Sequence, residues 1–102
     1  IDHHRQVWSQ LYTRPELARV RDPLPGLEKT PITPEEELFA TQVILHLSGV
    51  FEATREGLIR PFDGAERDIR SFFSNPIPRE VWRRKRAFQN RDFVEYLEQI
   101  LK

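Results

Sequence analysis

The chain has 102 residues, 38% hydrophobic and 31% charged, a composition that predicts one folded domain over residues 1–102 and excludes a disordered chain. Sixteen basic and sixteen acidic side chains cancel, so no overall charge attracts nucleic acid or a membrane. The absence of cysteine excludes disulfide bonds and thiolate metal sites.

The N-terminal third predicts one helix, a second short element and a connector. Four apolar residues recur at helical spacing within residues 2–12 and form one side of a helix: Val7, Trp8, Leu11 and Tyr12. Residues 13–16 predict the start of the second short element, in which Leu17 and Val20 face inward. Residues 22–33 carry three prolines and predict an extended connector.

A long central helix is predicted over residues 35–59. Thr33 serves as its N-cap, and the three glutamates that follow Pro34 favour the positive end of the helix dipole. Leu38 and Leu45 lie on the far side and allow a second, smaller contact there. The main apolar face covers an arc of about 140° and consists of Phe39, Ala40, Val43, Ile44, Leu47, Val50, Phe51, Thr54 and Leu58.

Three further helices are predicted in the C-terminal half. The first spans residues 64–74, with Asp63 and Glu66 as a capping box, and its apolar side is Ala65, Ile69, Phe72 and Phe73. Prolines break the chain at 75–78, and the next helix runs from 78 or 79 to about 89. Asn90 caps the last helix, whose apolar face is Phe93, Val94, Leu97, Ile100 and Leu101. The predicted fold is therefore all-α, a small bundle of about five helices with no sheet.

The densest run of charge is Arg83-Arg84-Lys85-Arg86. At about 100° per residue these four side chains point to different sides of the helix. Binding to several phosphates at once requires basic side chains that form a stripe along one face. The stems of Arg84 and Lys85 can cover Trp82 and Phe88, which form the apolar side of this helix, and Lys85 can lie over the indole of Trp82. Four acidic partners are available: Glu80, Asp92, Glu95 and Glu98. The favoured interpretation is a solvated, ion-paired helix.

The alternative interpretation is an anion-binding site for lipid headgroups or nucleic acid. Its candidate residues lie in the segment 79–91, which we call the basic segment: Arg79, Arg83, Arg84, Lys85, Arg86 and Arg91. Nucleic acid is disfavoured because the charges form no stripe.

No catalytic, cofactor or metal site is predicted. His3 and His4 are adjacent and point to different sides of a helix, so they cannot hold one metal ion together. His46 stands alone and is interpreted as structural. The chain has no glycine-rich phosphate loop, no H-E-x-x-H, no G-x-S-x-G and no cysteine nucleophile, so an enzyme is not expected.

The first residue is Ile1, and the chain contains no methionine. We expect a fragment of a longer protein, with a missing piece upstream. No apolar run approaches the ~18 residues that a membrane-spanning helix needs, and no signal-peptide pattern is present.

Three stretches carry a resemblance to a known family: LYTRPELARV from Leu11 to Val20, EEELF with ILHLSGVFEA, and DIRSFFSNPIPREVWRRKRAFQNRDFVEYLE. Together they resemble a bacterial family of uncharacterised proteins in which a short N-terminal transmembrane helix precedes a small cytosolic helical domain. The resemblance carries no catalytic motif. It implies a location, the cytoplasmic face of the bacterial inner membrane, with the anchor in the absent upstream segment.

Two functions remain open at this point. The first is a membrane-tethered helical domain that binds another protein or a second copy of itself. The second is direct binding of an anionic surface by the basic segment. The identity of a partner is beyond the sequence.

Overall fold

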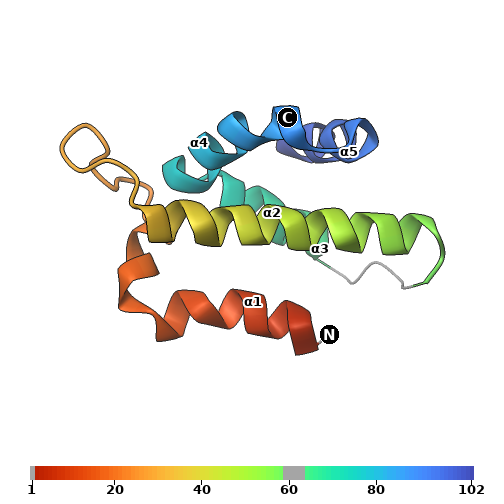
Figure 1. The fold of residues 1–102 in the computed structure, drawn as a ribbon, viewed down its shortest axis with the longest axis horizontal. Coiled ribbons are helices and arrows are strands. Elements are labelled where there is room, and N and C mark those ends of the chain that lie inside the picture. The colour runs from red at the N-terminus through yellow and green to blue at the C-terminus, as the bar shows by residue number, and fades with distance from the viewer. Residues whose placement is uncertain (1, 59–63) are drawn as a thin grey trace.

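A computed structural model describes residues 2–58 and 64–102. In these ranges the chain forms five α-helices and two 3₁₀ helices and no strand, which confirms the all-α prediction. The elements are α1 (Asp2–Thr13), η1 (Pro15–Arg21), α2 (Pro34–Arg55), α3 (Ala65–Phe73), α4 (Pro76–Lys85), η2 (Arg86–Phe88) and α5 (Arg91–Leu101). Helix α2 lies between α1 on one side and α4 and α5 on the other (Figure 1).

Helix α2 begins where the sequence predicts, because its first turn is closed by a capping box. The Thr33 hydroxyl oxygen accepts from the Glu36 backbone N–H, and the Glu36 carboxylate accepts from the Thr33 N–H. Pro34 occupies the first helical position, where a missing N–H costs nothing.

The end of α2 differs from the prediction, which extended the helix to residue 59. The helix ends at Arg55, and Gly57 follows with φ of 78°. The N–H groups of Gly57 and Leu58 donate back to the carbonyls of Thr54 and Ala53 at 3.1 and 2.9 Å. Both bonds belong to a Schellman motif, which stops a helix at a left-handed glycine. Leu58 is therefore exposed instead of lying on the apolar face, and Ile59 falls outside the described residues.

Helix α4 begins two or three residues earlier than predicted. The first N–H groups of a helix have no partner inside it, so prolines are tolerated there. Pro76 and Pro78 lie in this first turn, and the Arg79 N–H donates to the Asn75 carbonyl at 3.1 Å. The prolines that were expected to separate two helices instead form the start of the second one.

The end of α4 also corrects a prediction, because the helix stops at Lys85 and not near Gln89. The 3₁₀ turn η2 follows and changes the direction in which side chains point. Phe88 is consequently 83% exposed, although the helical register had placed it beside Trp82 on the apolar side. Trp82 is the aromatic anchor of this helix, with 3% of its surface exposed, and Ile77 and Val81 are completely buried beside it.

Smaller differences occur in α1 and α3. Tyr12 was expected on the apolar side of α1 but is exposed, and the Arg21 guanidinium lies 4.4 Å from its ring centroid. The N-cap of α3 is Gly64, which offers no side-chain cap. Asp63 lies outside the described residues, so the predicted capping box with Glu66 remains a prediction.

The core is a single cluster to which η1 and all five α-helices contribute. Leu17 and Val20 of η1, Val43 and Ile44 of α2, and Phe93 of α5 are completely buried there. A series of aromatic contacts with centroids 4.9–6.3 Å apart crosses the core through Tyr96, Phe51, Phe93, Trp82, Phe73, Phe72 and Trp8. These rings connect α5 and α2 to α4, α3 and α1, so one hydrophobic core supports the whole described chain.

Candidate functional site

The basic segment lies on α4, η2 and the first residue of α5. At its centre, Arg83 and Arg84 share the carboxylate of Glu80. Arg83 donates to it from Nε and Nη2 at 2.9 and 2.6 Å, and Arg84 donates from Nε at 3.0 Å. These i,i+3 and i,i+4 pairs follow from the helical spacing and leave both guanidinium groups largely exposed.

Glu37 in the first turn of α2 provides a second carboxylate. Arg84 Nη1 donates to Glu37 Oε1 at 2.8 Å, and Lys85 Nζ lies 4.0 Å from Glu37 Oε2. The cation–π contacts in the described part of the chain are Arg21 over Tyr12 and Arg55 over Phe51, so the contact of Lys85 with Trp82 that the sequence allowed is not formed. The nearby Glu37 carboxylate explains this, because it offers the ammonium group a full negative charge.

The remaining basic residues pair with α5, with one exception. Arg86 Nη1 donates to Glu98 Oε1 at 2.8 Å, and Arg91 Nε donates to Glu95 Oε1 at 3.4 Å. Arg79 is exposed and forms no ion pair with the described residues. The structure therefore brings five of the six candidate residues onto carboxylates of the chain.

The partners of two carboxylates, Glu37 and Asp92, were not correctly predicted from the sequence. Glu37 was considered only as part of the acidic first turn of α2, and no local pattern reveals a contact across 47 residues. Asp92 was expected near the basic segment, but it accepts from Arg55 Nη1 at 2.6 Å instead. Arg55 Nη2 also lies 3.0 Å from Glu52 Oε2. The hydrogen bond that Arg55 donates to Asp92, and then the charges of both carboxylates, raise the pKa of Arg55.

The shared carboxylate of Glu80 is strongly stabilised in its ionised form. The hydrogen bond from Arg83 lowers the pKa of Glu80 from 4.5 to about 2, and the bond from Arg84 acts in the same direction against partial burial. The same contacts raise the pKa of Arg83, and bonds to Glu37 and Glu80 raise the pKa of Arg84. All three groups stay ionised over the physiological pH range.

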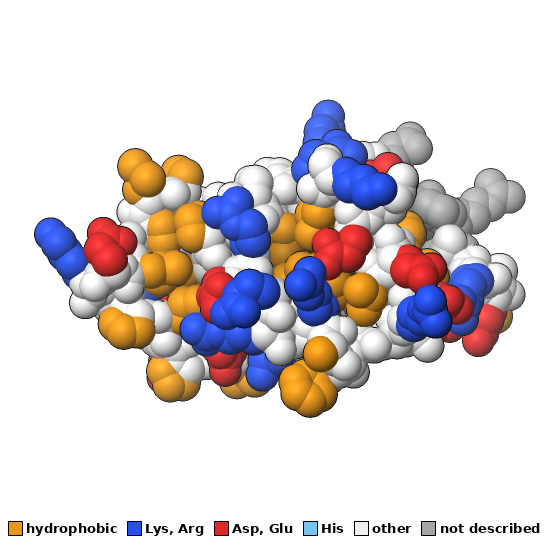
Figure 2. All heavy atoms as spheres, turned by 90° about the horizontal axis from the view of Figure 1, so that it is seen from above, with side chains coloured by type: hydrophobic (Ala, Val, Ile, Leu, Met, Phe, Trp, Pro, Cys, Tyr) orange, Lys and Arg blue, Asp and Glu red, His pale blue; other side chains and the backbone are white. Residues whose placement is uncertain are grey.

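A groove of about 800 Å³ runs beside the basic segment, between the connector, α4 and the end of α5. We call it the arginine-rimmed groove. Its apolar surface comes from Leu27, Pro31, Ile32, Pro76, Trp82 and Leu101. Its charged rim consists of Arg79, Arg83, Arg84, Arg86, Glu80 and Glu98. Figure 2 shows the face above α4 and α5, on which hydrophobic side chains lie between basic and acidic ones.

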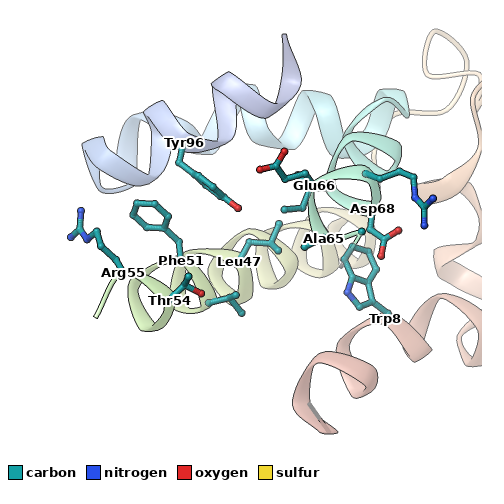
Figure 3. Close-up of a pocket in the computed structure, with 13 residues that line it drawn as sticks. Trp8, Leu47, Phe51, Thr54, Arg55, Ala65, Glu66, Asp68 and Tyr96 are labelled. Atoms are coloured by element: carbon teal, nitrogen blue, oxygen red, sulfur yellow. The ribbon is translucent and has the colours of Figure 1, made fainter. Parts of the chain in front are cut away.

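A second groove of about 610 Å³ lies between the C-terminal half of α2, the start of α3 and α5. We call it the aromatic groove. Figure 3 shows Tyr96 and Phe51 together at one end and Trp8 at the other, with Leu47 between them. Burial, and secondarily the charge of Glu66, raise the pKa of Tyr96. The phenol therefore remains neutral and able to donate a hydrogen bond at physiological pH.

The structure describes the side chain of only one of the three histidines. The side chains of His3 and His4 lie outside the described residues. His46 is half-buried on α2 and does have an interaction within the chain. Within the described ranges no three His, Cys, Asp or Glu side chains gather as metal ligands would. The structural role of His46 stays a prediction.

The comparisons with known proteins provide no relative. No family model, no curated protein and no solved structure matches the chain. Within residues 2–58 and 64–102, no helix has both the length and the apolar character to cross a bilayer.

Proposed function

We propose that the chain is a helical protein-interaction module that is tethered to the cytoplasmic face of a bacterial inner membrane. The observation that carries the interaction role is the aromatic groove, where Trp8, Phe51 and Tyr96 line a hollow that is open to solvent. Aromatic side chains of this kind are enriched where proteins bury surface against a partner.

The rim of the aromatic groove supports the same proposal. Glu66 and Asp68 on α3 and Arg67 between them line the groove, and none of the three forms an ion pair with the described residues. Uncompensated charges around an apolar floor can fix the orientation of a bound partner. Leu38 and Leu45, exposed on the outer side of α2, add apolar surface elsewhere on the same helix.

A photo-crosslinking experiment tests the interaction role. Benzoylphenylalanine is introduced at Thr54, in the aromatic groove, or at Gln42, an exposed position outside the groove on the same helix. We expect a discrete protein adduct in cells that express the complete gene product with the probe at position 54, and none with the probe at 42. The absence of an adduct at 54, or equal adducts at both positions, would argue against this surface as an interaction site.

The proposed tether is supported by the resemblance to N-terminally anchored bacterial proteins. Its test is fractionation of cells that express the complete gene product. A tethered protein stays with the membrane fraction through washes with high salt and alkaline carbonate, and detergent releases it. Recovery of the protein in the first salt wash would contradict the tether.

The alternative function is binding of an anionic surface by the basic segment. The observation that favours it is Arg79, which has no carboxylate partner among the described residues. Opposing it are the carboxylates of Glu37, Glu80, Glu95 and Glu98, which already occupy the other five basic residues. These carboxylates offset most of the positive charge that would attract an anionic surface.

A further inference from the structure

We propose that the arginine-rimmed groove binds an acidic, amphipathic segment of a partner protein. This inference rests on the proposed interaction function and specifies the chemistry of one partner. The apolar side chains of the segment would cover Leu27, Ile32 and Leu101. Its carboxylates would meet Arg79 and the outward-facing N–H groups of Arg83 and Arg86.

The charge of the groove determines the sign of the partner. Four arginines and two glutamates line it, which leaves an excess of two positive charges. Lys85 and Glu37, which lie 4.0 Å apart beside the groove, balance each other and do not change this excess. A segment that carries carboxylates is thus attracted to the groove, and a basic segment is repelled.

The arginines retain hydrogen-bond donors although most of them are already paired. Arg83 uses Nε and Nη2 on Glu80, so both hydrogens of Nη1 remain uncommitted within the described structure. Arg86 uses only Nη1 on Glu98, and the guanidinium group of Arg79 has no hydrogen-bond acceptor in the described ranges. These N–H groups can donate hydrogen bonds to carboxylates of a partner without breaking the internal ion pairs.

The apolar floor distinguishes a peptide from a membrane or a nucleic acid. Leu27 and Ile32 come from the connector and Leu101 from α5, and all three are only partly buried against the core. Charges that surround such a floor favour a ligand with apolar side chains. A flat anionic surface would instead engage outlying cations such as Arg91, which is 90% exposed and is not part of the groove.

The experiment uses a random peptide library displayed on phage, selected against the immobilised protein at low salt. We expect the selected peptides to combine Asp or Glu with Leu, Phe or Trp. Their affinity is then measured by fluorescence anisotropy for the parent protein and three variants. These are Arg79→Ala on the rim, Leu27→Ser on the floor and Arg91→Ala as a matched control outside the groove. Thermal unfolding verifies that each variant is folded.

Arg79→Ala should weaken binding about tenfold, the effect of losing one charge-assisted hydrogen bond. Leu27→Ser should weaken it as well, and Arg91→Ala should leave it unchanged. Arg79 has no internal ion pair among the described residues, so its removal should not disturb folding. Because rim charges attract the peptide, the affinity of the parent protein should also fall as salt rises.

Each of the remaining outcomes identifies which part of the proposal is wrong. A selection that enriches no acidic sequence, or peptides that bind Arg79→Ala and Leu27→Ser as tightly as the parent, would overturn the groove assignment and leave the interaction function standing. A dimer that Arg79→Ala dissociates in sedimentation equilibrium would assign the groove to a second copy of the chain. Capture by phosphatidylglycerol vesicles that Arg79→Ala and Arg91→Ala weaken equally would overturn both the groove proposal and the interaction function.

Discussion

The indole N–H of Trp82 donates a hydrogen bond to Glu98 Oε1 at 3.3 Å, and Arg86 Nη1 donates to the same oxygen at 2.8 Å. One carboxylate of α5 thus connects the buried anchor of α4 to a residue of the basic segment. Because the indole is almost completely buried, its N–H needs this acceptor.

The first prediction concerns this anchor. Trp82→Ala should lower the free energy of unfolding by about 3–5 kcal/mol, because it leaves a cavity between Phe73 and Phe93. Trp82→Phe keeps most of the apolar contact and should cost clearly less. Urea unfolding monitored by circular dichroism measures both changes. An alanine variant as stable as the parent would show that α4 is not anchored in this way.

The second prediction concerns Glu36, which is only 1% exposed. Its Oε1 accepts from the Thr33 N–H at 2.9 Å and from Arg19 Nη2 at 3.3 Å. Arg19 Nε lies 3.1 Å from Oε2 but is not oriented for a hydrogen bond. Glu36→Ala removes the cap and leaves the partly buried guanidinium without its anion, so it should cost about 2–4 kcal/mol.

Two further variants separate the contributions of Glu36. Glu36→Gln keeps an oxygen for the Thr33 N–H and loses only the charge, so it should cost less than alanine. Glu35→Ala, at the exposed neighbouring position, should cost about 0.5 kcal/mol through the helix dipole. If Glu35→Ala and Glu36→Ala were equally stable in thermal unfolding, the ion pair of Glu36 with Arg19 would not contribute more to stability than an exposed charge at the helix start.

The third prediction concerns the pH dependence of Glu80. Its folded-state pKa is about 2, below the ordinary 4.5, so the stabilisation is fully present above about pH 4.5 and is lost as the pH falls towards 2. Arg83→Gln should raise this pKa towards 4.5, as measured by NMR titration of the Glu80 carboxyl carbon.

The stability difference between the parent and Arg83→Gln should therefore shrink as the pH falls from 4.5 towards 2. At neutral pH the difference should stay below about 1 kcal/mol, because the pair is largely exposed. A Glu80 pKa that is the same in both proteins would contradict the assignment of Arg83 as its main partner.

The fourth prediction compares two phenylalanines. Phe51 is half-buried, with its ring centroid 4.9 Å from that of Tyr96 and 5.9 Å from that of Phe93. Phe51→Ala should cost about 2–3 kcal/mol, less than the 3–5 kcal/mol of a fully buried ring. Phe88→Ala, at an exposed position, should change stability by less than about 0.5 kcal/mol. Equal losses from the two substitutions would contradict the exposure of Phe88.

The fold was predictable wherever local signals and apolar spacing agree. The start of α2 is determined by three neighbouring residues, Thr33, Pro34 and Glu36. The start of α5 is determined by Asn90, whose side chain accepts from the N–H groups of Asp92 and Phe93. The inward direction of Leu17 and Val20 was also correct, because both are completely buried.

The errors arose where an alternative local structure was equally compatible with the sequence. Prolines at 76 and 78 suit both a break and a first helical turn, and only packing of Ile77 into the core decides for the helix. The position of Phe88 depends on where α4 ends, which the spacing alone does not determine. The grooves join segments far apart in sequence, such as Leu27 and Leu101, and therefore leave no local pattern.

The most direct test of the account is binding of this chain, without any tether, to vesicles of phosphatidylcholine and phosphatidylglycerol at low salt. We predict no capture, because intramolecular carboxylates occupy five of the six basic residues. The matched control is the variant Glu80→Gln, Glu98→Gln, which frees Arg83 and Arg86 and should bind the vesicles. Capture of the parent chain that disappears at high salt would contradict a protein-interaction module and favour an anion-binding surface.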